Sequence, residues 1–274
     1  MSIAQVEFDY LRRLVRDYSA IEIDAGKEYL AELRLSPLLV EHGARSVQEF
    51  LQSLRTQQVG CVHRRVVDAM TNNETWFFRD HHPFGTLSSQ IIPEMITRRA
   101  SERRLHIWSA ACSTGQEPYS IAMILHERFQ IPGWQHSILA TDIAESVLAR
   151  ARSGLYSQLE INRGLPANLL VRYFLRDGAN WAVRPEVRNM VLFQMMNLAE
   201  AWKSLPPMDI VLMRNVLIYF NVPIRRQILA WVRRVLRPDG YLLLGSAETT
   251  LSLDGNFERV PFEKCAFYRV RDTL

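Results

Sequence analysis

The chain has 274 residues, of which 48% are hydrophobic and 23% charged, and this composition is typical of a folded globular protein rather than a disordered or fibrous one. Its longest apolar runs, such as 208–213, fall far short of the ~20 residues that span a bilayer, and its first residues carry no apolar signal core. Cys61, Cys112 and Cys265 are widely spaced and form no CxxC pair, which predicts neither a disulfide framework nor a zinc site. We therefore expect a cytoplasmic protein that binds no metal and is not inserted in a membrane.

The net charge is +4, from 33 Lys and Arg residues against 29 Asp and Glu residues. Arginine supplies 30 of the basic residues and lysine only 3, which fits a compositional bias of the genome as well as a binding adaptation. The charge permits contact with nucleic acid or with an acidic protein surface and does not decide between them.

Residues 1–75 are predicted to be all helical. Apolar residues recur at helical spacing in the first helix, namely Phe8, Leu11, Leu14 and Tyr18. A second helix ends at Gly43, a residue typical of a C-terminal cap. Ser46 followed by Glu49 predicts a capping box at the start of a third helix, and a fourth helix covers about 61–70.

From residue 105 onward the pattern alternates between strands and helices, which predicts βαβ units and a mostly parallel sheet. The expected strands are 105–110, 136–143, 191–198, 208–215 and 240–248. Asn221 is the expected N-cap of a helix that ends at Gly240. The last two strands, 257–261 and 264–270, are expected to form an antiparallel edge.

An inserted subdomain is predicted at about 156–190, because this stretch is longer than an ordinary helix-to-strand connection. It contains a predicted helix at 165–174 and a predicted hairpin at 174–185 that turns at Asp177 and Gly178.

The segment between the first strand and the first helix of the sheet has the character of a nucleotide-binding loop. The strand ends near Ala110, small residues fill 111–115, and a helix starts near Pro118, so that backbone can approach a ligand closely. The loop lacks both GxGxxG and GxxxxGK[ST], which argues against a dinucleotide or NTPase loop. An ordinary tight turn is the alternative.

Four polar residues follow strands of the predicted sheet: Asp142 after the second, Asn197 after the third, and Arg214 and Asn215 after the fourth. They are expected to meet at the carboxyl edge of the sheet, where such folds bind ligands, with Asp142 placed to bind ribose hydroxyls. The alternative for Asp142 is a helix N-cap. A second polar and aromatic cluster, 71–80, precedes the sheet, and its alternative is a packed interdomain linker.

Six segments of the chain, taken in order, carry the motifs of one family: TNNETWFFRD, WSAACSTGQEPYS, ATDI, ARSGLY, MRNVLIYF and RPDGYLLLGSAE. They resemble the chemotaxis receptor methyltransferase family, CheR, over nearly the whole chain. One departure is Gln116, where the family usually has Glu.

The resemblance implies an α/β fold of the class I S-adenosylmethionine-dependent methyltransferase type. This fold is Rossmann-like, with a mostly parallel seven-stranded sheet, an antiparallel edge and an inserted small β-hairpin subdomain, and an all-α N-terminal domain precedes it. The implied divisions are a receptor-docking domain at 1–75, a linker that contributes to the cofactor site at 76–104, and a catalytic domain at 105–274.

The resemblance also implies S-adenosylmethionine (SAM) as the methyl donor and S-adenosylhomocysteine as its product. The acceptors would be glutamate side chains on the cytoplasmic helices of transmembrane chemoreceptors. Matching positions assign donor contacts to Asn73, Thr75, Arg79, Glu117, Asp142, Asn197, Leu198, Arg214 and Asn215. Arg79 and Tyr219 are expected near the acceptor, and the alternative for Tyr219 is a packed aromatic side chain.

A basic face on the helical domain is the expected docking surface for an acidic receptor, through Arg12, Arg13, Arg16, Arg34, Arg45, Arg64 and Arg65. The alternative is an ordinary solvated helix face. Some family members also tether to a receptor's C-terminal pentapeptide through the inserted subdomain. The hairpin at 174–185 is shorter than in those members, so we expect no such tether.

Three other functions are considered. A nucleic-acid methyltransferase is disfavoured because Arg214-Asn215-Val216-Leu217 stands where amino-methylating enzymes carry an Asn/Asp-Pro-Pro-aromatic motif, so we expect no nucleic-acid partner. A non-catalytic adapter would not need the complete donor site. A nicotinamide dehydrogenase is disfavoured by the single-glycine loop.

Overall fold

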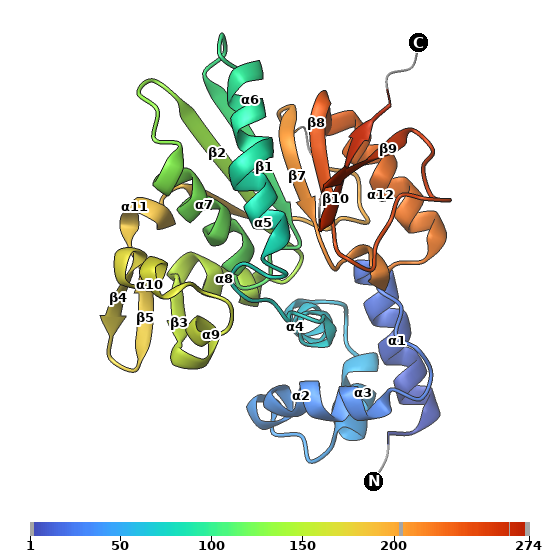
Figure 1. Ribbon diagram of the computed structural model, residues 1–274. Helices are drawn as coiled ribbons and strands as arrows, with labels where there is room; N and C mark the ends of the chain where they lie inside the picture. The colour runs from blue at the N-terminus through green and yellow to red at the C-terminus, as the bar shows by residue number, and fades with distance from the viewer. Residues whose placement is uncertain (1–2, 203–204, 263, 272–274) are drawn as a thin grey trace. The chain divides into compact units, whose positions relative to one another are not determined.

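Figure 1 shows the protein as a computed structural model, which describes residues 3–202, 205–262 and 264–271. The chain divides into two units. The first consists of Met1–Asn72 and Tyr219–Ile224, and the second of Asn73–Ile218 and Arg225–Leu274.

The predicted catalytic domain spans 105–274. The segment Tyr219–Ile224 lies within that range but belongs to the first unit. Backbone pairing accounts for the difference. Ile21 and Phe220 form an antiparallel bridge, and the N–H of Glu22 donates to the carbonyl of Tyr219 at 3.2 Å. These partners are nearly 200 residues apart in the chain, so a reading of local patterns does not reveal the pairing.

The first unit contains the four predicted helices: α1 (Gln5–Ser19), α2 (Glu28–His42), α3 (Val47–Arg55) and α4 (Cys61–Met70). In α1 the residues Phe8, Leu11 and Val15 are fully buried, as their spacing on one helical face predicts. They pack with apolar residues of the other three helices in one core. The helical prediction for this part of the chain is confirmed.

The predicted caps of α2 and α3 are confirmed with one correction. Gly43 ends α2 in the left-handed conformation, with φ of 64°. At α3 the hydroxyl of Ser46 accepts from the N–H of Glu49 at 3.1 Å, as expected. The Glu49 carboxylate, however, accepts from the N–H of Arg45 rather than from that of Ser46, so the reciprocal bond reaches one residue further back.

The second unit is built on a seven-stranded sheet with the strand order β6-β2-β1-β7-β8-β10-β9. Its strands are β1 (Arg104–Ala110), β2 (Gln135–Asp142), β6 (Val191–Met195), β7 (Met208–Met213), β8 (Leu236–Leu244), β9 (Phe257–Phe262) and β10 (Cys265–Val270). Neighbouring strands from β6 to β8 are parallel, whereas β10 is antiparallel to both β8 and β9. The predicted parallel sheet with an antiparallel edge is confirmed.

Helices α7 (Gln116–Arg128), α8 (Glu145–Ser153) and α12 (Val222–Val235) connect these strands, and the 3₁₀ turn η2 (Leu217–Tyr219) follows β7. Asn221 caps α12 as predicted, since its Oδ1 accepts from the N–H of Ile224 at 3.1 Å.

The predicted end of the α12 helix at Gly240 is wrong. The helix ends at Val235, and Gly240 lies inside β8, whose pairing with β7 shifts register in this region. A Cβ at Gly240 would lie 2.8 Å from the carbonyl oxygen of Asp209. The glycine is therefore explained by close strand approach rather than by a helix cap.

The stretch 76–104, which the sequence analysis treats as a linker, contains a run of helix. It is formed by α5 (His82–Thr86), the π-helical turn η1 (Leu87–Ile91) and α6 (Ile92–Arg98). Gly85 and Pro93, residues that usually mark turns, conceal this run in the sequence.

The inserted subdomain is a three-stranded sheet of order β3-β5-β4 with short helices. Its elements are β3 (Leu155–Ser157), α9 (Gln158–Asn162), α10 (Ala167–Tyr173), β4 (Phe174–Asp177), β5 (Asn180–Val183) and α11 (Pro185–Arg188). The predicted helix and hairpin are present, and β3 is a third strand that the sequence analysis did not predict.

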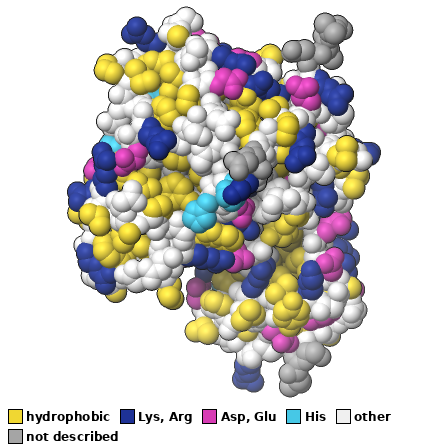
Figure 2. Space-filling view, in the orientation of Figure 1, with side chains coloured by type: hydrophobic (Ala, Val, Ile, Leu, Met, Phe, Trp, Pro, Cys, Tyr) yellow, Lys and Arg dark blue, Asp and Glu magenta, His cyan; other side chains and the backbone are white. Residues whose placement is uncertain are grey.

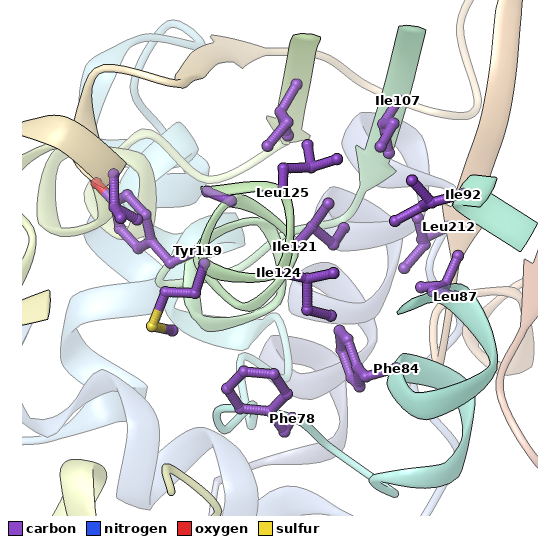
Figure 3. Close-up of a cluster of buried hydrophobic side chains, with 14 of the residues drawn as sticks. Phe78, Phe84, Leu87, Ile92, Ile107, Tyr119, Ile121, Ile124, Leu125 and Leu212 are labelled. Atoms are coloured by element: carbon purple, nitrogen blue, oxygen red, sulfur yellow. The ribbon is translucent and has the colours of Figure 1, made fainter. Parts of the chain in front are cut away.

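The main core lies between one face of the large sheet and the helices η1, α6 and α7. Figure 3 shows Leu87, Ile92 and Ile121 gathered about the sheet residues Ile107 and Leu212. All five side chains are almost completely buried. This packing fixes α7, and with it the loop before α7, against the carboxyl ends of the strands.

A buried charged network supports the start of the sheet. The guanidinium of Arg99 donates to Asp209 Oδ1 at 2.5 Å and to Asp239 Oδ2 at 2.9 Å, while the second oxygen of Asp209 accepts from the N–H of His106. The hydrogen bond from Arg99 lowers the pKa of Asp239 below its ordinary value of 3.8. Asp209 is wholly buried, and its pairing with Arg99 compensates its charge.

Candidate functional site

The loop after β1 has an unusual backbone. Its φ values are positive at Ala111 (55°), Ser113 (51°) and Gly115 (93°). Non-glycine residues rarely adopt this region, and where they do the surrounding structure must hold them there. The loop therefore has one defined shape just before the start of α7.

A hydrogen bond and close packing fix the loop in this shape. The hydroxyl of Tyr156, a fully buried side chain of β3, donates to the carbonyl of Thr114 at 2.7 Å. A Cβ at Gly115 would lie 2.9 Å from the Cβ of Ala151, so this position has no room for a side chain. The inserted subdomain thus contributes to the loop through Tyr156.

Asp142, at the end of β2, accepts hydrogen bonds from backbone N–H groups through both of its carboxylate oxygens. Its Oδ2 accepts from the N–H of Ser113 at 2.8 Å, and its Oδ1 accepts from the N–H of Ala144 at 3.0 Å. Burial raises the pKa of the Asp142 carboxyl above its ordinary value, and these N–H groups act in the opposite direction. The carboxylate joins the loop after β1 to the turn after β2.

Arg214, directly after β7, is the centre of a buried charged cluster. Its Nη1 donates to Glu117 Oε2 at 2.9 Å, and its Nη2 donates to Asp80 Oδ2 at 2.6 Å and to the carbonyl of Arg79 at 2.9 Å. The other oxygen of Glu117 accepts from the hydroxyl of Ser109. The Arg214 side chain is only 2% exposed, so this cluster ties β1, β7, α7 and the segment before α5 together.

Two arginine side chains pack against the aromatic and polar segment before α5. The guanidinium groups of Arg79 and Arg163 lie 4.3 and 4.1 Å from the ring centre of Trp76. Arg163 also pairs with the Glu74 carboxylate at 2.6 Å, and Arg79 donates to the Glu74 carbonyl at 3.0 Å. Arg163 follows α9, so the inserted subdomain also positions Arg79.

Backbone contacts complete this arrangement. The hydroxyl of Ser113 donates to the carbonyl of Asn73 at 2.7 Å, and the N–H of Phe78 donates to the hydroxyl of Ser120 at 3.0 Å. A Cβ at Gly164 would lie 2.1 Å from the carbonyl oxygen of Phe77. Thr75 lies half-buried in the same segment.

Asn197 and Leu198 follow β6 in a turn. Asn197 Oδ1 accepts from the N–H of Ala199 at 3.0 Å, and Leu198 is buried. The carbonyl of Leu198 accepts from the indole N–H of Trp202 at 3.2 Å. The ring of Trp202 in turn packs edge-on against that of Trp108 in β1, with centroids 4.9 Å apart, which anchors the turn to the sheet.

Asn215 adopts the left-handed conformation, with φ of 58°, and the Glu248 carboxylate holds it there. Glu248 Oε2 accepts from the N–H groups of Asn215 and Gly245, both at 2.7 Å. Its Oε1 accepts from the N–H of Val216 at 2.8 Å and that of Ile218 at 3.3 Å. One buried carboxylate therefore shapes the whole turn after β7.

Tyr219 ends η2 and belongs to the first unit. Its hydroxyl accepts from the Asn72 side-chain amide at 2.7 Å, and the ring is half-buried.

Several of the residues predicted to contact SAM therefore lie at the carboxyl ends of strands that are close together in the sheet. Asp142, Asn197, Arg214 and Asn215 follow the carboxyl ends of β2, β6 and β7, which lie close in the strand order. Contacts join Arg79, Glu117 and Arg214 directly or through backbone. Other residues that build the site are not among the predicted contacts, namely Asp80, Ser109, Tyr156, Arg163 and Glu248.

The described parts of the chain contain neither a candidate metal cluster nor a membrane-spanning helix. In residues 3–202, 205–262 and 264–271, no three His, Cys, Asp or Glu side chains are grouped closely enough to hold a metal ion. Over the same ranges, no helix has the length and apolar character needed to cross a membrane.

Comparison with known families decides what this architecture is. Residues 73–266 match the family described as CheR methyltransferase, SAM binding domain, and residues 6–71 match its all-alpha domain. The chain belongs to the CheR methyltransferase family. The resemblance drawn from the motifs is confirmed, as is the fold, an all-α N-terminal domain followed by a SAM-binding methyltransferase domain.

Relatives match along almost their entire length. The chain is 39% identical to chemotaxis protein methyltransferase 1 of Pseudomonas aeruginosa, covering 99% of this chain and 100% of the relative. It is 38% identical to a chemotaxis protein methyltransferase of Pseudomonas putida, with 99% and 100% covered. It is 37% identical to chemotaxis protein methyltransferase 1 of Vibrio cholerae, with 99% of each chain covered.

Proposed function

We propose that this protein transfers the methyl group of SAM to glutamate side chains on the cytoplasmic helices of transmembrane chemoreceptors. The products would be glutamate 5-O-methyl esters and S-adenosylhomocysteine, and the reaction would serve chemotactic adaptation in the cytoplasm. The names of the relatives support the chemotactic setting. The choice of a carboxylate as acceptor rests on the site itself.

The observation that carries this choice is that the carboxylates of the site are all engaged. Both oxygens of Glu117, Asp142 and Glu248 accept hydrogen bonds, and Asp80 pairs with Arg214. A hydrogen bond donated to a carboxylate favours its ionised form and so works against its taking a proton from an acceptor. An amine must lose a proton during methyl transfer, whereas a glutamate with an ordinary pKa near 4.3 is already ionised at neutral pH.

The chain's task in this reaction is positioning. The sulfonium of bound SAM supplies an activated methyl group, so the acceptor carboxylate needs only to be aligned with it and stripped of water. We assign Arg79 to guide the acceptor carboxylate and Tyr219 to line the path to the methyl group. The contacts of Arg163 with Trp76 and Glu74 support a fixed position for Arg79.

Buried polar atoms without partners support binding of the methionine end of SAM. Asn215 Oδ1 is a buried acceptor and Arg79 Nε a buried donor, and neither has a hydrogen-bond partner among the described residues. These atoms complement an ammonium and a carboxylate group. We place Arg79 and Glu117 toward this end, with Glu117 acting partly through Arg214.

The rest of the donor is assigned by position along the sheet edge. We place Asp142 near the ribose, and Asn197 and Leu198 near the adenine. Asn73 and Thr75 complete the set of proposed donor contacts.

The helical domain, 1–75, is our proposed receptor-docking domain. Figure 2 shows Lys and Arg side chains spread over the visible face with Asp and Glu side chains among them. Several of the predicted docking arginines are already engaged: Arg12 with Ile23, Arg16 with Asp17, Arg34 with Met70, Arg64 with Tyr18 and Arg65 with Glu41. Arg13 and Arg45 are exposed and have no ion pair in the described chain, so we propose that these two contribute most to docking.

The decisive experiment is methyl transfer from radiolabelled SAM to membranes that contain the host's chemoreceptors, followed by treatment with alkali. A methyl ester releases its label as volatile methanol, whereas an N-methyl group does not. Alkali-labile label on the receptor band is the expected result. Alkali-stable label would refute the carboxylate acceptor, and binding of SAM without any transfer would favour an adapter.

Substitutions separate the proposed roles. R79A and Y219F should lower turnover more than they weaken SAM affinity, because both residues are assigned to the acceptor. Arg79 is also a proposed donor contact, so R79A should weaken SAM binding more than Y219F does. R128A is a matched control, since Arg128 is an exposed arginine with no recorded partner in the same unit as Arg79. Turnover that stays at the wild-type level in both R79A and Y219F would refute the assignments.

A further inference from the structure

A pocket of about 420 Å³ opens beside the candidate site, at the carboxyl end of β8 and the start of β10. Leu243, Leu244, Phe262 and Tyr268 supply its apolar wall. All of its lining residues belong to the second unit. Of the SAM-contacting residues implied by the resemblance, Arg214 alone is among the residues that line this pocket.

The acidic side chains at this pocket have partners within the protein, whereas two of its basic side chains do not. Its two acids are engaged, because Asp80 pairs with Arg214 and Glu248 accepts four backbone N–H groups. The side chains of its exposed cations, Arg259 and Lys264, have no recorded hydrogen bond or ion pair with any described residue. The charge available to a ligand is therefore positive.

The side chain of His82, at the start of α5, adds a hydrogen-bond donor to the same lining. A pocket with an apolar wall and free cationic groups complements a carboxylate carried on an aliphatic stem.

The pocket is adjacent to the place where methyl transfer is proposed. Asp80 and Arg214 belong to both, and β8 is the neighbour of β7 in the sheet. A polypeptide that presents one carboxylate to the proposed acceptor position would therefore bring neighbouring side chains toward this pocket.

We propose that the pocket binds an acidic side chain of the protein substrate, close to the glutamate that is methylated. Arg259 and Lys264 are then specificity-determining residues that favour acceptor sites with a second acid nearby. This inference rests on the proposed function for the identity of the substrate, but binding at the pocket can be measured without methyl transfer.

The test compares two double variants that remove the same charge. R259A/K264A takes away the free cations of the pocket. R128A/R234A takes away two exposed arginines of the second unit that also have no recorded partner and do not line the pocket. Binding of a fluorescent cytoplasmic fragment of a host chemoreceptor is measured by anisotropy with S-adenosylhomocysteine present, and KM and kcat are measured with the same fragment.

We expect R259A/K264A to weaken fragment binding and raise KM by about tenfold, with SAM affinity unchanged, and R128A/R234A to change either by less than about twofold. Equal effects in the two double variants would mean general electrostatic attraction and would overturn the proposal. So would wild-type binding in R259A/K264A.

A second arm separates a protein side chain from a free anion. Inorganic phosphate is titrated into the wild type and R259A/K264A by calorimetry. If R259A/K264A loses phosphate binding but binds the fragment normally, the pocket is a free-anion site and the proposal is wrong.

Failure of the proposed function has a different signature. In that case the wild type forms no alkali-labile label on the receptor, while fragment binding still depends on Arg259 and Lys264. If the label forms and neither binding nor KM depends on this pair, only the pocket inference fails.

Discussion

The substitution E248Q tests whether one buried carboxylate shapes the turn after β7. Glu248 is 9% exposed, and its two oxygens accept from four backbone N–H groups, two on each oxygen. A glutamine has almost the same shape, but one of its two terminal groups is an NH₂ donor. In either orientation of the amide, two backbone N–H groups then face a donor instead of an acceptor.

The magnitude follows from the number of bonds lost. A hydrogen bond to a charged group contributes about 1.5–3 kcal/mol, so losing two predicts a decrease of about 3–6 kcal/mol in the free energy of unfolding. For a chain of this size, 1 kcal/mol corresponds to a shift of roughly 2–4 °C in Tm. The expected Tm is therefore lower by at least about 6 °C.

Urea unfolding at pH 7, followed by tryptophan fluorescence, measures this difference. E258Q is the control, because the Glu258 side chain is exposed in β9 and has no recorded partner, and it should change the free energy by less than about 0.5 kcal/mol. If E248Q lies within about 1 kcal/mol of the wild type, the four bonds do not stabilise the turn and the reasoning is refuted.

Two further predictions concern other parts of the second unit. G164A should lower the free energy of unfolding by more than about 2 kcal/mol in thermal unfolding, because its Cβ would lie 2.1 Å from the Phe77 carbonyl at a φ of +89°. G178A is the control, since Gly178 also has a positive φ but a Cβ there would meet nothing within 4 Å, and it should lower the free energy much less. Equal decreases in the two variants would contradict the packing argument. The pKa of Asp239 is lowered by Arg99, so its ionised form stabilises the fold above pH 3.8 and this contribution is lost as pH falls through the lowered pKa. D239N should therefore flatten the acid slope of unfolding free energy below pH 3.8, and an unchanged slope would show that the ion pair contributes nothing to it.

Elements set by local chemistry were predicted well. Helix α4 was expected at about 61–70 and is found at Cys61–Met70, and Gly43 and Asn221 cap helices as their residue types indicate. In each case the controlling interaction lies within one helical turn. A single sequence contains all the information that such an element needs.

The contacts that shape the candidate site join distant parts of the chain. Arg214 and Asp80 are separated by 134 positions, and Arg163 and Glu74 by 89. No spacing rule relates such residues, and the motif analysis could name Arg214 without revealing its partners. Glu248 was missed for the same reason, since its carboxylate reaches back 33 positions to Asn215.

The wrong end of the α12 helix has a different origin. Pro238 breaks the helical pattern after Arg237, so the local sequence already marks the end of the helix before Gly240. The pairing of Leu236 with Met208 in β7 then makes the following segment part of a strand. The helix boundary was therefore readable from the proline, whereas the strand pairing was not readable from local pattern.

The attachment of Gly164 and Arg163 to the segment before α5 restricts how the inserted subdomain can vary. A hairpin of another length or sequence can be accommodated at Asp177 and Gly178, where a Cβ on the glycine would meet nothing within 4 Å. The other end has no such freedom, because a side chain at position 164 would collide with the Phe77 carbonyl. A chimaera that exchanges the tip of the hairpin should keep its methyltransferase site, whereas one that exchanges all of 155–190 must retain the Arg163-Gly164 pair to do so.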